Sequence, residues 1–435
     1  MRSESGTAAT PFAPGRLPLL GHLPALARAP LRFVRSCDEH GPVLRIGLAG
    51  TSAYLVTDAE LVRTMLIARS THFAKGIHYE KLGELLGSSL STVTGVEHRD
   101  RRRLMQPAFH HRYLDGFAEV VRRATVELVD GWRDGQVIAV DTVMRRLALT
   151  IVAEAMCSSS LDRRMIEGVQ HDLPVVMRGV ALRVMLSSGL IDRVPVPANR
   201  RFHAANRRLR ATVAELVARY RAAGLEHDDL LSLLLHAHHP VTGKALSDNQ
   251  ICDEMVNLLF AGTETTGNAL AWLWYAVSRH PEVEQRLRDE ASTDCGEYTR
   301  RVVRETLRLY PPPWLVSRQV RQPVRLGTHD LPVGAHVLFS PYAIQRNPAN
   351  FPHPERFDPD RWLPHRAAES NRHAYLAFGA GAQNCIGEGF AMLELTTVAR
   401  TIASRYRLVP IGTTVEKASA TLIPSRLTMR IHTAR

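Results

Sequence analysis

The sequence predicts an α+β fold, mainly helical with a smaller β part, in one domain that spans residues 1–435. Helical periodicity dominates from about residue 58 to residue 310, and short apolar runs punctuated by Gly and Pro flank it on both sides. No internal repeat or linker divides the chain. With 45% hydrophobic and 23% charged residues, the chain is long enough to bury a large core.

The flanking segments supply the predicted β part. Residues 1–30 are rich in Pro and Gly and predict an extended N-terminal segment. Val43–Leu48 and Ala53–Thr57 surround a Gly/Thr/Ser turn, which is typical of a β-hairpin, and Leu331–Phe339 predicts a second hairpin. The β part is therefore expected in residues 31–57, in about 315–345 and in strands that close the chain.

One predicted helix is unusually long. Ser247 and Gln250 fit an S-x-x-Q capping box, and the helical pattern continues until Pro281. About 32 residues at 1.5 Å each give a length of roughly 48 Å, enough to cross a domain. Two segments interrupt the helical pattern elsewhere, a polar loop at 77–95 and an apolar, Pro-containing stretch at 173–197.

Composition argues against several classes of protein. The cysteines form no CxxC pair, so neither a disulfide framework nor a zinc cluster is predicted, and a reducing cytoplasm is the expected location. No apolar run is long enough for a transmembrane helix, so no membrane anchor is expected. The net charge of +12 comes without aromatic interleaving, which favours a basic face for an acidic protein partner over nucleic-acid binding.

The middle of the long helix reads Ala261-Gly-Thr-Glu-Thr-Thr-Gly267, an odd composition for a helix interior. Each glycine costs about 1 kcal/mol relative to alanine. In one interpretation the small residues allow another helix to pack closely. In the other a flat ligand lies against the helix, Glu264 and Thr265 pass protons, and local loosening at the glycines frees a carbonyl. The sequence leaves both open.

Glu305 and Arg308 are spaced to pair on one helix. If they are buried they need further partners, because losing one member of a buried pair costs about 3–5 kcal/mol. Arg361 is the expected third member, ahead of Arg356.

A second candidate site is the loop Phe378–Phe390, FGAGAQNCIGEGF. It lacks the third glycine of a dinucleotide fingerprint, because Asn384 occupies that position, and Gln383 stands where a nucleophile elbow needs its first glycine. A catalytic Cys–His pair stays open but does not explain the glycines. A haem thiolate does, since glycines let the backbone approach a porphyrin and a helix expected after Cys385 favours a thiolate.

Taken in order and spacing, PLLGH, AGTETT, ETLRLYPP, FDPDRWLP and FGAGAQNCIG resemble a cytochrome P-450 over nearly the whole chain. The resemblance implies the cytochrome P-450 fold, with haem between the long helix and the cysteine loop. It implies that Cys385 is the axial iron ligand and that Glu264 and Thr265 are the catalytic acid–alcohol pair. It further implies a structural triad of Glu305, Arg308 and Arg361, and haem contacts from His98, Arg102, Arg318, Phe378, Gly379, Gly381, Gln383, Gly387 and Ala261.

Gln383 departs from the family pattern, which has arginine or histidine two residues before the cysteine to pair with a haem propionate. We therefore predict weaker haem retention and a slightly altered iron potential. Arg99, Arg101 and Arg103 predict a solvated basic face, which is compatible with docking of an acidic ferredoxin.

The resemblance implies a monooxygenase that inserts one oxygen atom from dioxygen into a C–H or C=C bond of a small lipophilic substrate. Its implied cofactor is haem b (iron protoporphyrin IX), with electrons from NAD(P)H through ferredoxin reductase and ferredoxin. A peroxide-driven haem enzyme and a haem ligand binder without turnover are rivals, and the intact acid–alcohol pair argues against both.

Substrate class is inferred from the residues expected beside the haem, which are mostly apolar. Several segments resemble bacterial members that act in terpenoid pathways, which favours a sesquiterpene-like or other cyclic terpenoid of secondary metabolism. A fatty acid, a steroid and a polyketide are the alternatives. A monomer is expected, with a substrate pocket formed by Ala261, Trp314, Leu315, Val316, Thr421 and the 77–95 loop.

Overall fold

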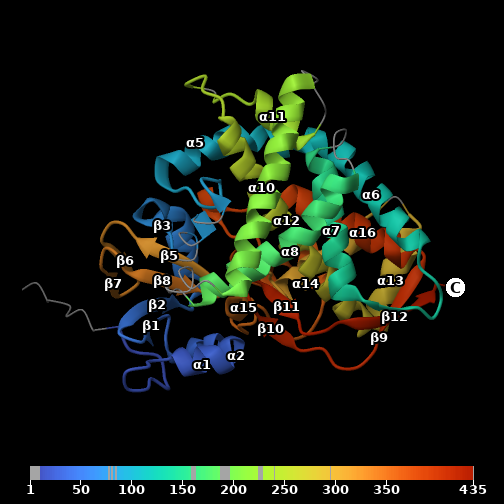
Figure 1. Ribbon diagram of the computed structural model, residues 1–435. Helices are drawn as coiled ribbons and strands as arrows, with labels where there is room; N and C mark the ends of the chain where they lie inside the picture. Colours follow the sequence, from blue (N-terminus) through green and yellow to red (C-terminus); the bar gives the residue numbers. More distant parts are fainter. Residues whose placement is uncertain are drawn as a thin grey trace, which may run out of the picture. The chain divides into compact units, whose positions relative to one another are not determined.

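The computed structural model describes residues 10–76, 79, 82–83, 86–157, 163–186, 196–223, 229–239, 241–293 and 295–434 (Figure 1). The chain forms two compact units, each assembled from segments distant in sequence. Unit 1 comprises residues 1–80 and 307–385, and unit 2 comprises residues 81–306 and 386–435. Helix and strand content together confirm the predicted α+β class.

Unit 1 is built on a five-stranded sheet with the order β1-β2-β8-β5-β3. Strands β2 and β8 pair in parallel, and every other pair in this sheet is antiparallel. A separate two-stranded ribbon joins β6 to β7. The bounds are β1 Val43–Leu48, β2 Thr51–Val56, β3 Phe73–Lys75, β5 Val316–Val320, β6 Val324–Leu326, β7 His329–Leu331 and β8 His336–Phe339, with helices α1 Leu23–Arg28, α2 Pro30–Ser36, α3 Ala59–Arg63 and α15 Pro341–Ile344.

The first predicted hairpin is confirmed, because β1 and β2 pair in register from Val43↔Val56 to Leu48↔Thr51. The second is wrong. Residues 332–335 turn the chain between β7, which pairs with β6, and β8, which pairs with β5 and β2. The apolar alternation therefore marks two strands of different sheets, and local pattern alone does not identify a strand's partner.

The prediction of an extended segment for residues 1–30 is also wrong in part. Residues 10–22 form isolated bridges and turns, but Leu23–Arg28 is helix α1 and α2 begins at Pro30. Proline lies in the first turn of both helices, where its missing N–H has no intrahelical partner to lose.

Unit 2 is mainly helical, and α12 packs most extensively against α7, and also against α10 and α16. A three-stranded sheet has the order β4-β12-β9, and β10 pairs with β11. The helices are α5 Gly95–Met105, α6 Leu114–Asp130, α7 Val140–Met156, α8 Arg163–Leu186, α10 Pro197–Ala223, α11 Leu230–His236, α12 Asp248–Ser278, α13 Pro281–Ala291, α14 Glu297–Leu309, which runs across the boundary into unit 1, and α16 Glu388–Ala403. The strands are β4 Val137–Ala139, β9 Tyr406–Pro410, β10 Glu416–Ala418, β11 Leu422–Pro424 and β12 Thr428–Thr433.

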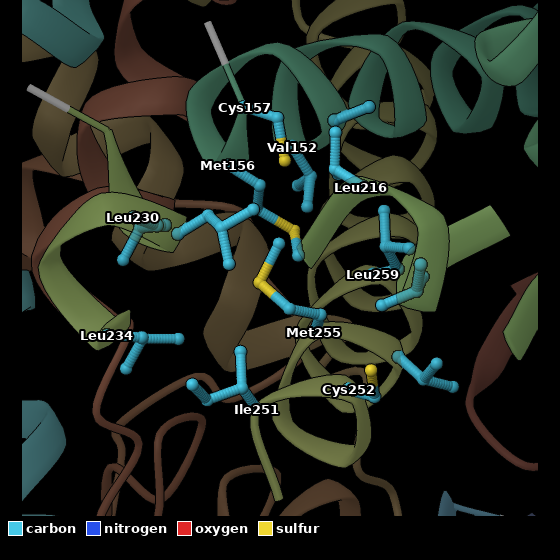
Figure 2. Close-up of a cluster of buried hydrophobic side chains, with 14 of the residues drawn as sticks. Val152, Met156, Cys157, Leu216, Leu230, Leu234, Ile251, Cys252, Met255 and Leu259 are labelled. Carbon is cyan, nitrogen blue, oxygen red and sulfur yellow. The ribbon is translucent and has the colours of Figure 1, made fainter. Parts of the chain in front are cut away.

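The core of unit 2 includes a cluster where α7, α10 and α11 meet α12 (Figure 2). Side chains from α12 interdigitate with those of α7, α10 and α11, and sulfur-containing side chains fill much of the centre. Methionine adapts to irregular gaps better than branched residues do. The labelled residues of this cluster are Val152, Met156, Cys157, Leu216, Leu230, Leu234, Ile251, Cys252, Met255 and Leu259.

The long helix begins as predicted. Ser247 accepts the backbone N–H of Gln250, and the Gln250 side chain accepts the backbone N–H of Ser247, so both halves of the capping box are present. The helix then continues for 31 residues. Within the described part of the chain, no helix combines the length and the apolar character needed to cross a bilayer.

The stretch 173–197 departs from its prediction as an interruption of the helical pattern. Helix α8 continues through Pro174 to Leu186, and α10 begins at Pro197, while residues 187–195 lie outside the described part. An interior proline costs about 3 kcal/mol. Burial of Leu173, Val176 and Val180 in the core offsets that cost, since each buried aliphatic side chain contributes about 1.5–3 kcal/mol.

The predicted polar loop at 77–95 is described only in part. Residues 77, 78, 80, 81, 84 and 85 lie outside the described residues, and residues 79, 82, 83 and 86 are helical. Residues 87–94 form the turns expected of a loop.

Candidate functional site

In unit 1 the cysteine loop has two backbone positions that favour glycine. The N–H of Cys385 donates to the carbonyl of Phe378 at 2.8 Å, which closes the loop. Gly379 and Gly381 have φ of +73° and +69°, and a Cβ on Gly381 would lie 2.2 Å from the carbonyl oxygen of Leu66. The Cys385 side chain is exposed, whereas Cys37, Cys157 and Cys252 are buried. The predicted helix follows, as α16 with Gly387 as its N-cap.

Two polar side chains of unit 1 fit an anionic ligand. Arg318 is 8% exposed and donates from Nη1 to the Ser317 carbonyl at 2.9 Å, but no carboxylate among the described residues pairs with it. Buried charges are normally paired. Gln383 Oε1 is buried with no hydrogen-bond partner in the described chain. An unpaired guanidinium, an amide that can turn its N–H₂ outward, and an exposed thiol together suit a haem with its propionates.

The three residues of the predicted structural triad are all buried. Arg308 donates to the carbonyls of Gln345 at 2.9 Å and Pro354 at 2.7 Å, and Arg361 donates to the carbonyl of Pro352 at 2.8 Å. The two arginines thus fix the chain around residues 352–356. Arg356 is exposed and contributes its carbonyl, at 3.1 Å from Arg308 Nη2. The ion pairing of Glu305 within the triad stays a prediction.

In unit 2, helix α12 is unbroken through the motif at 261–267, without the local loosening that one of the two interpretations of the motif included. A Cβ on Gly262 would lie 2.6 Å from Val152 Cγ2, and one on Gly267 would lie 2.6 Å from the Cα of Arg145. Both neighbours belong to α7, so close helix packing explains the glycines. The hydroxyl of Thr265 donates to the carbonyl of Ala261 at 2.5 Å.

Glu264 lies on the same helix and is half-buried. Its Oε1 accepts hydrogen bonds from Asn268 Nδ2 at 3.0 Å and from Thr421 Oγ1 at 3.1 Å. Thr421, expected in the substrate pocket, therefore bonds directly to the predicted catalytic acid. Asn268 was missed by the sequence reasoning, although its position one turn after Glu264 places it on the same helix face.

Helix α5 holds the predicted propionate ligands His98 and Arg102 one turn apart. His98 is buried, and Arg102 is half-buried with its Nε bonded to Gln106 Oε1 at 3.2 Å. Arg99 and Arg103 are exposed, as expected of a basic face. These two positions leave the prediction of a docking face open.

Arg101 contradicts the prediction of a solvated face. It is 5% exposed, and its Nη1 lies 2.9 Å from Glu254 Oε1 and 2.9 Å from the carbonyl of Ser88. Glu254 also accepts the N–H of Leu90 at 2.8 Å, and burial raises its pKa to about 7. In helix α5, Arg101 lies on the face of the buried Leu104 and Met105 rather than on that of its exposed neighbours.

A second acid on α12 extends this cluster. Asp253 accepts the N–H of Ser88 at 2.8 Å through Oδ2 and Arg210 Nη1 at 2.7 Å through Oδ1. Gly87 has φ of +70°, and a Cβ there would lie 2.2 Å from Asp253 Oδ1. The turn 87–90 is thus fixed to α12 by two carboxylates. The sequence signal for this cluster was the pair of adjacent acids, Asp253 and Glu254, in a mainly apolar helix, and it was missed.

The remaining predicted pocket residues lie before and at the start of β5 in unit 1. Trp314, Leu315 and Val316 are half-buried, and the Trp314 carbonyl accepts the Ser340 hydroxyl at 2.6 Å. Ala261 is half-buried on α12 in unit 2.

Comparison with known proteins identifies the family of the chain. A family model described as cytochrome P-450 covers residues 11–430. Cyclooctat-9-en-7-ol 5-monooxygenase from Streptomyces melanosporofaciens is 41% identical over 419 residues, which are 93% of this chain and 91% of that relative. Pentalenene oxygenase from Streptomyces avermitilis is 35% identical over 438 residues, 97% of either chain.

Among solved structures, the crystal structure of the cytochrome P-450DA heme domain matches with a TM-score of 0.87 at 26% identity, over 99% of this chain and 98% of that one. The resemblance seen in the sequence and the predicted fold are both confirmed. The chain therefore belongs to the cytochrome P-450 family and is a monooxygenase of that family.

Proposed function

We propose that this monooxygenase inserts one oxygen atom from dioxygen into a C–H or C=C bond of a small cyclic terpenoid in bacterial secondary metabolism. The observation that carries the proposal is the near full-length similarity to relatives that modify terpenoids, at 35–41% identity. The apolar, half-buried residues 314–316 support a lipophilic substrate. A fatty acid, a steroid or a polyketide would be the alternative.

As a member of the family the chain requires haem, dioxygen and reducing electrons. We assign haem b, which the Cys385 thiolate would hold through the iron, with His98, Arg102 and Arg318 for the propionates. Bound there, the haem would supply dioxygen activation, which thiolate ligation favours. The exposed thiol and the buried Arg318, which no carboxylate of the described residues pairs with, support this assignment.

The chain's own residues handle protons. Thr265 directs its hydroxyl proton to the carbonyl of Ala261, so its Oγ1 lone pairs stay available to accept a hydrogen bond from water. Glu264 lies one residue earlier and would exchange protons with that water, a role in which a positioned acid typically contributes about 10²–10⁴-fold in rate.

Electrons would come from NAD(P)H through a ferredoxin reductase and a ferredoxin. The exposed Arg99 and Arg103 on α5 offer an acidic ferredoxin complementary charge, which mainly accelerates association. Raising the salt concentration should therefore slow reduction by the partner, and should slow it less in an Arg99→Ala/Arg103→Ala double variant.

Spectral titration tests the substrate class. A panel of cyclic terpenoid hydrocarbons and alcohols, fatty acids and steroids is titrated into the purified holoenzyme, and the low-spin to high-spin shift is recorded. We expect shifts at micromolar concentrations from cyclic terpenoids. If only fatty acids or steroids shift the spectrum, the terpenoid proposal is wrong. Turnover supported by hydrogen peroxide alone at the NAD(P)H-driven rate would favour the peroxide-driven rival.

A further inference from the structure

The carboxylate of Glu264 is the end point of a hydrogen-bonded cluster drawn from α12, α7 and the residue before β11. Asn268 Nδ2 lies 3.0 Å from Glu264 Oε1 and 3.0 Å from Thr421 Oγ1, and Thr421 Oγ1 lies 3.1 Å from the same Oε1. Asn268 is fully buried and Thr421 is 8% exposed. One carboxyl oxygen therefore accepts two hydrogen bonds from buried groups.

The direction of every hydrogen bond in this cluster follows from Arg145. Its Nη1 lies 3.2 Å from Asn268 Oδ1, and a guanidinium can only donate. The amide oxygen of Asn268 therefore faces Arg145, and its N–H₂ group faces Glu264 and Thr421. Because Thr421 accepts from Asn268, its hydroxyl proton is directed to Glu264. All donors point towards the acid.

Both ends of the cluster are held in place, one by close helix packing and an ion pair, the other by a hydrogen bond to the backbone. Gly267 brings α12 so close to α7 that a Cβ would lie 2.6 Å from the Cα of Arg145. Arg145 is also held by Asp141, whose Oδ2 accepts its Nη2 at 3.0 Å. On the other side, Trp272 Nε1 donates to the carbonyl of Leu422 at 3.0 Å, which fixes the residue next to Thr421 against α12.

We propose that Asn268, Thr421 and Arg145 are positioning residues that hold Glu264 in one orientation for proton exchange, an inference that rests on the proposed role of Glu264. Proton transfer requires heavy atoms within about 2.6–3.2 Å, so a carboxylate free to change rotamer would spend much of its time out of reach. Two donors on Oε1 fix the rotamer and leave Oε2 for the exchange.

The test measures how NAD(P)H electrons are divided between product and hydrogen peroxide in the reconstituted holoenzyme. Glu264→Gln should lower product formation by about 10²-fold. Thr421→Val and Arg145→Met should each lower product per NAD(P)H by about three- to tenfold, with a larger solvent deuterium effect. KM should stay unchanged in Arg145→Met, because Arg145 is not one of the predicted pocket residues. Arg145→Lys should restore part of the loss, because lysine still donates to Asn268.

Arg146→Met is the matched control. Arg146 is the next residue of α7 and is exposed, so its loss should leave product per NAD(P)H unchanged. If Glu264→Gln retains full product formation, the proposed role of Glu264 is wrong, and this inference is overturned with it. If Glu264→Gln is impaired while Thr421→Val and Arg145→Met match the Arg146→Met control, the inference alone is overturned.

A second readout does not depend on turnover. A double-mutant cycle with Arg145→Met and Asn268→Leu measures whether the effects of the two changes on the free energy of unfolding in urea are coupled. We expect the double variant to be destabilised less than the sum of the single variants, because each single change breaks the same hydrogen bond. Additive effects would contradict the cluster and overturn the inference.

Discussion

Arg101 of α5 and Glu254 of α12 form a buried ion pair, with Nη1 2.9 Å from Oε1 and side chains 4% and 0% exposed. The same carboxylate accepts the N–H of Leu90, and the neighbouring Asp253 accepts the N–H of Ser88. The pair therefore ties three segments of unit 2 together, two helices and the turn 87–90. Oε2 of Glu254 has no hydrogen-bond partner in the described chain, so the cost of burying this carboxylate is only partly offset.

Glu254 should make stability fall as the pH rises. Burial, with a smaller contribution from Asp253, outweighs the hydrogen bond from the Leu90 N–H and the attraction of Arg101, and raises the pKa of Glu254 from 4.5 to about 7. Between these values the folded state holds a proton that the unfolded state has released, so the stabilisation is present below pH 4.5 and lost through pH 7. We expect the unfolding free energy of the native protein, relative to Glu254→Gln, to fall by roughly 2–4 kcal/mol across this window.

Urea unfolding of both proteins between pH 5 and pH 8 measures this difference, because the glutamine variant cancels the contribution of all other titrating groups. A difference that rises with pH would mean that the attraction of Arg101 outweighs burial, and would contradict the raised pKa.

Replacing Gly87 should release the turn 87–90. Gly87→Ala places a methyl group in a left-handed conformation, at a cost of about 1–2 kcal/mol, and drives it into the carboxylate of Asp253, 2.2 Å from Oδ1. Hydrogen exchange at the amides of Ser88 and Leu90 should accelerate, since both donate to the α12 acids.

Gly83→Ala is the control for this change. A Cβ on Gly83 would lie 3.7 Å from Thr92, an ordinary contact, so exchange at Ser88 and Leu90 should be unchanged. Equal exchange in the two variants would show that the approach of Gly87 to Asp253 does not hold the turn.

Gln383→Arg should strengthen haem retention. A hydrogen bond that involves a charged group contributes about 1.5–3 kcal/mol and one between neutral groups about 0.5–1.5 kcal/mol, and arginine adds a positive charge beside the propionate. The arginine should therefore slow haem transfer to apomyoglobin by up to about tenfold, with a small shift of the iron reduction potential. Unchanged transfer rate and unchanged potential would remove Gln383 from the proposed propionate contacts.

Features set by local sequence were predicted well. The capping box at Ser247, the hairpin of β1 and β2 and the helix after Cys385 depend on residues a few positions apart. Their geometry follows from capping, turn residues and periodicity.

Features set by distant partners were not predicted. Glu264 and Thr421 are 157 residues apart, and Leu90 and Glu254 are 164 apart, so no local pattern reports either contact. The pairing of β8 with β2 and β5 was not predicted for the same reason. Arg101 was placed with its exposed neighbours because residue type was weighed and helical phase was not.

Turnover under ¹⁸O₂ tests the central claim most directly. The holoenzyme is supplied with NAD(P)H, a ferredoxin, its reductase and a cyclic terpenoid, and the product is analysed by mass spectrometry, with Cys385→Ser as the control. The account predicts one ¹⁸O atom in each terpenoid product molecule and no product from Cys385→Ser. Product that contains oxygen from water, or undiminished product from Cys385→Ser, would contradict it.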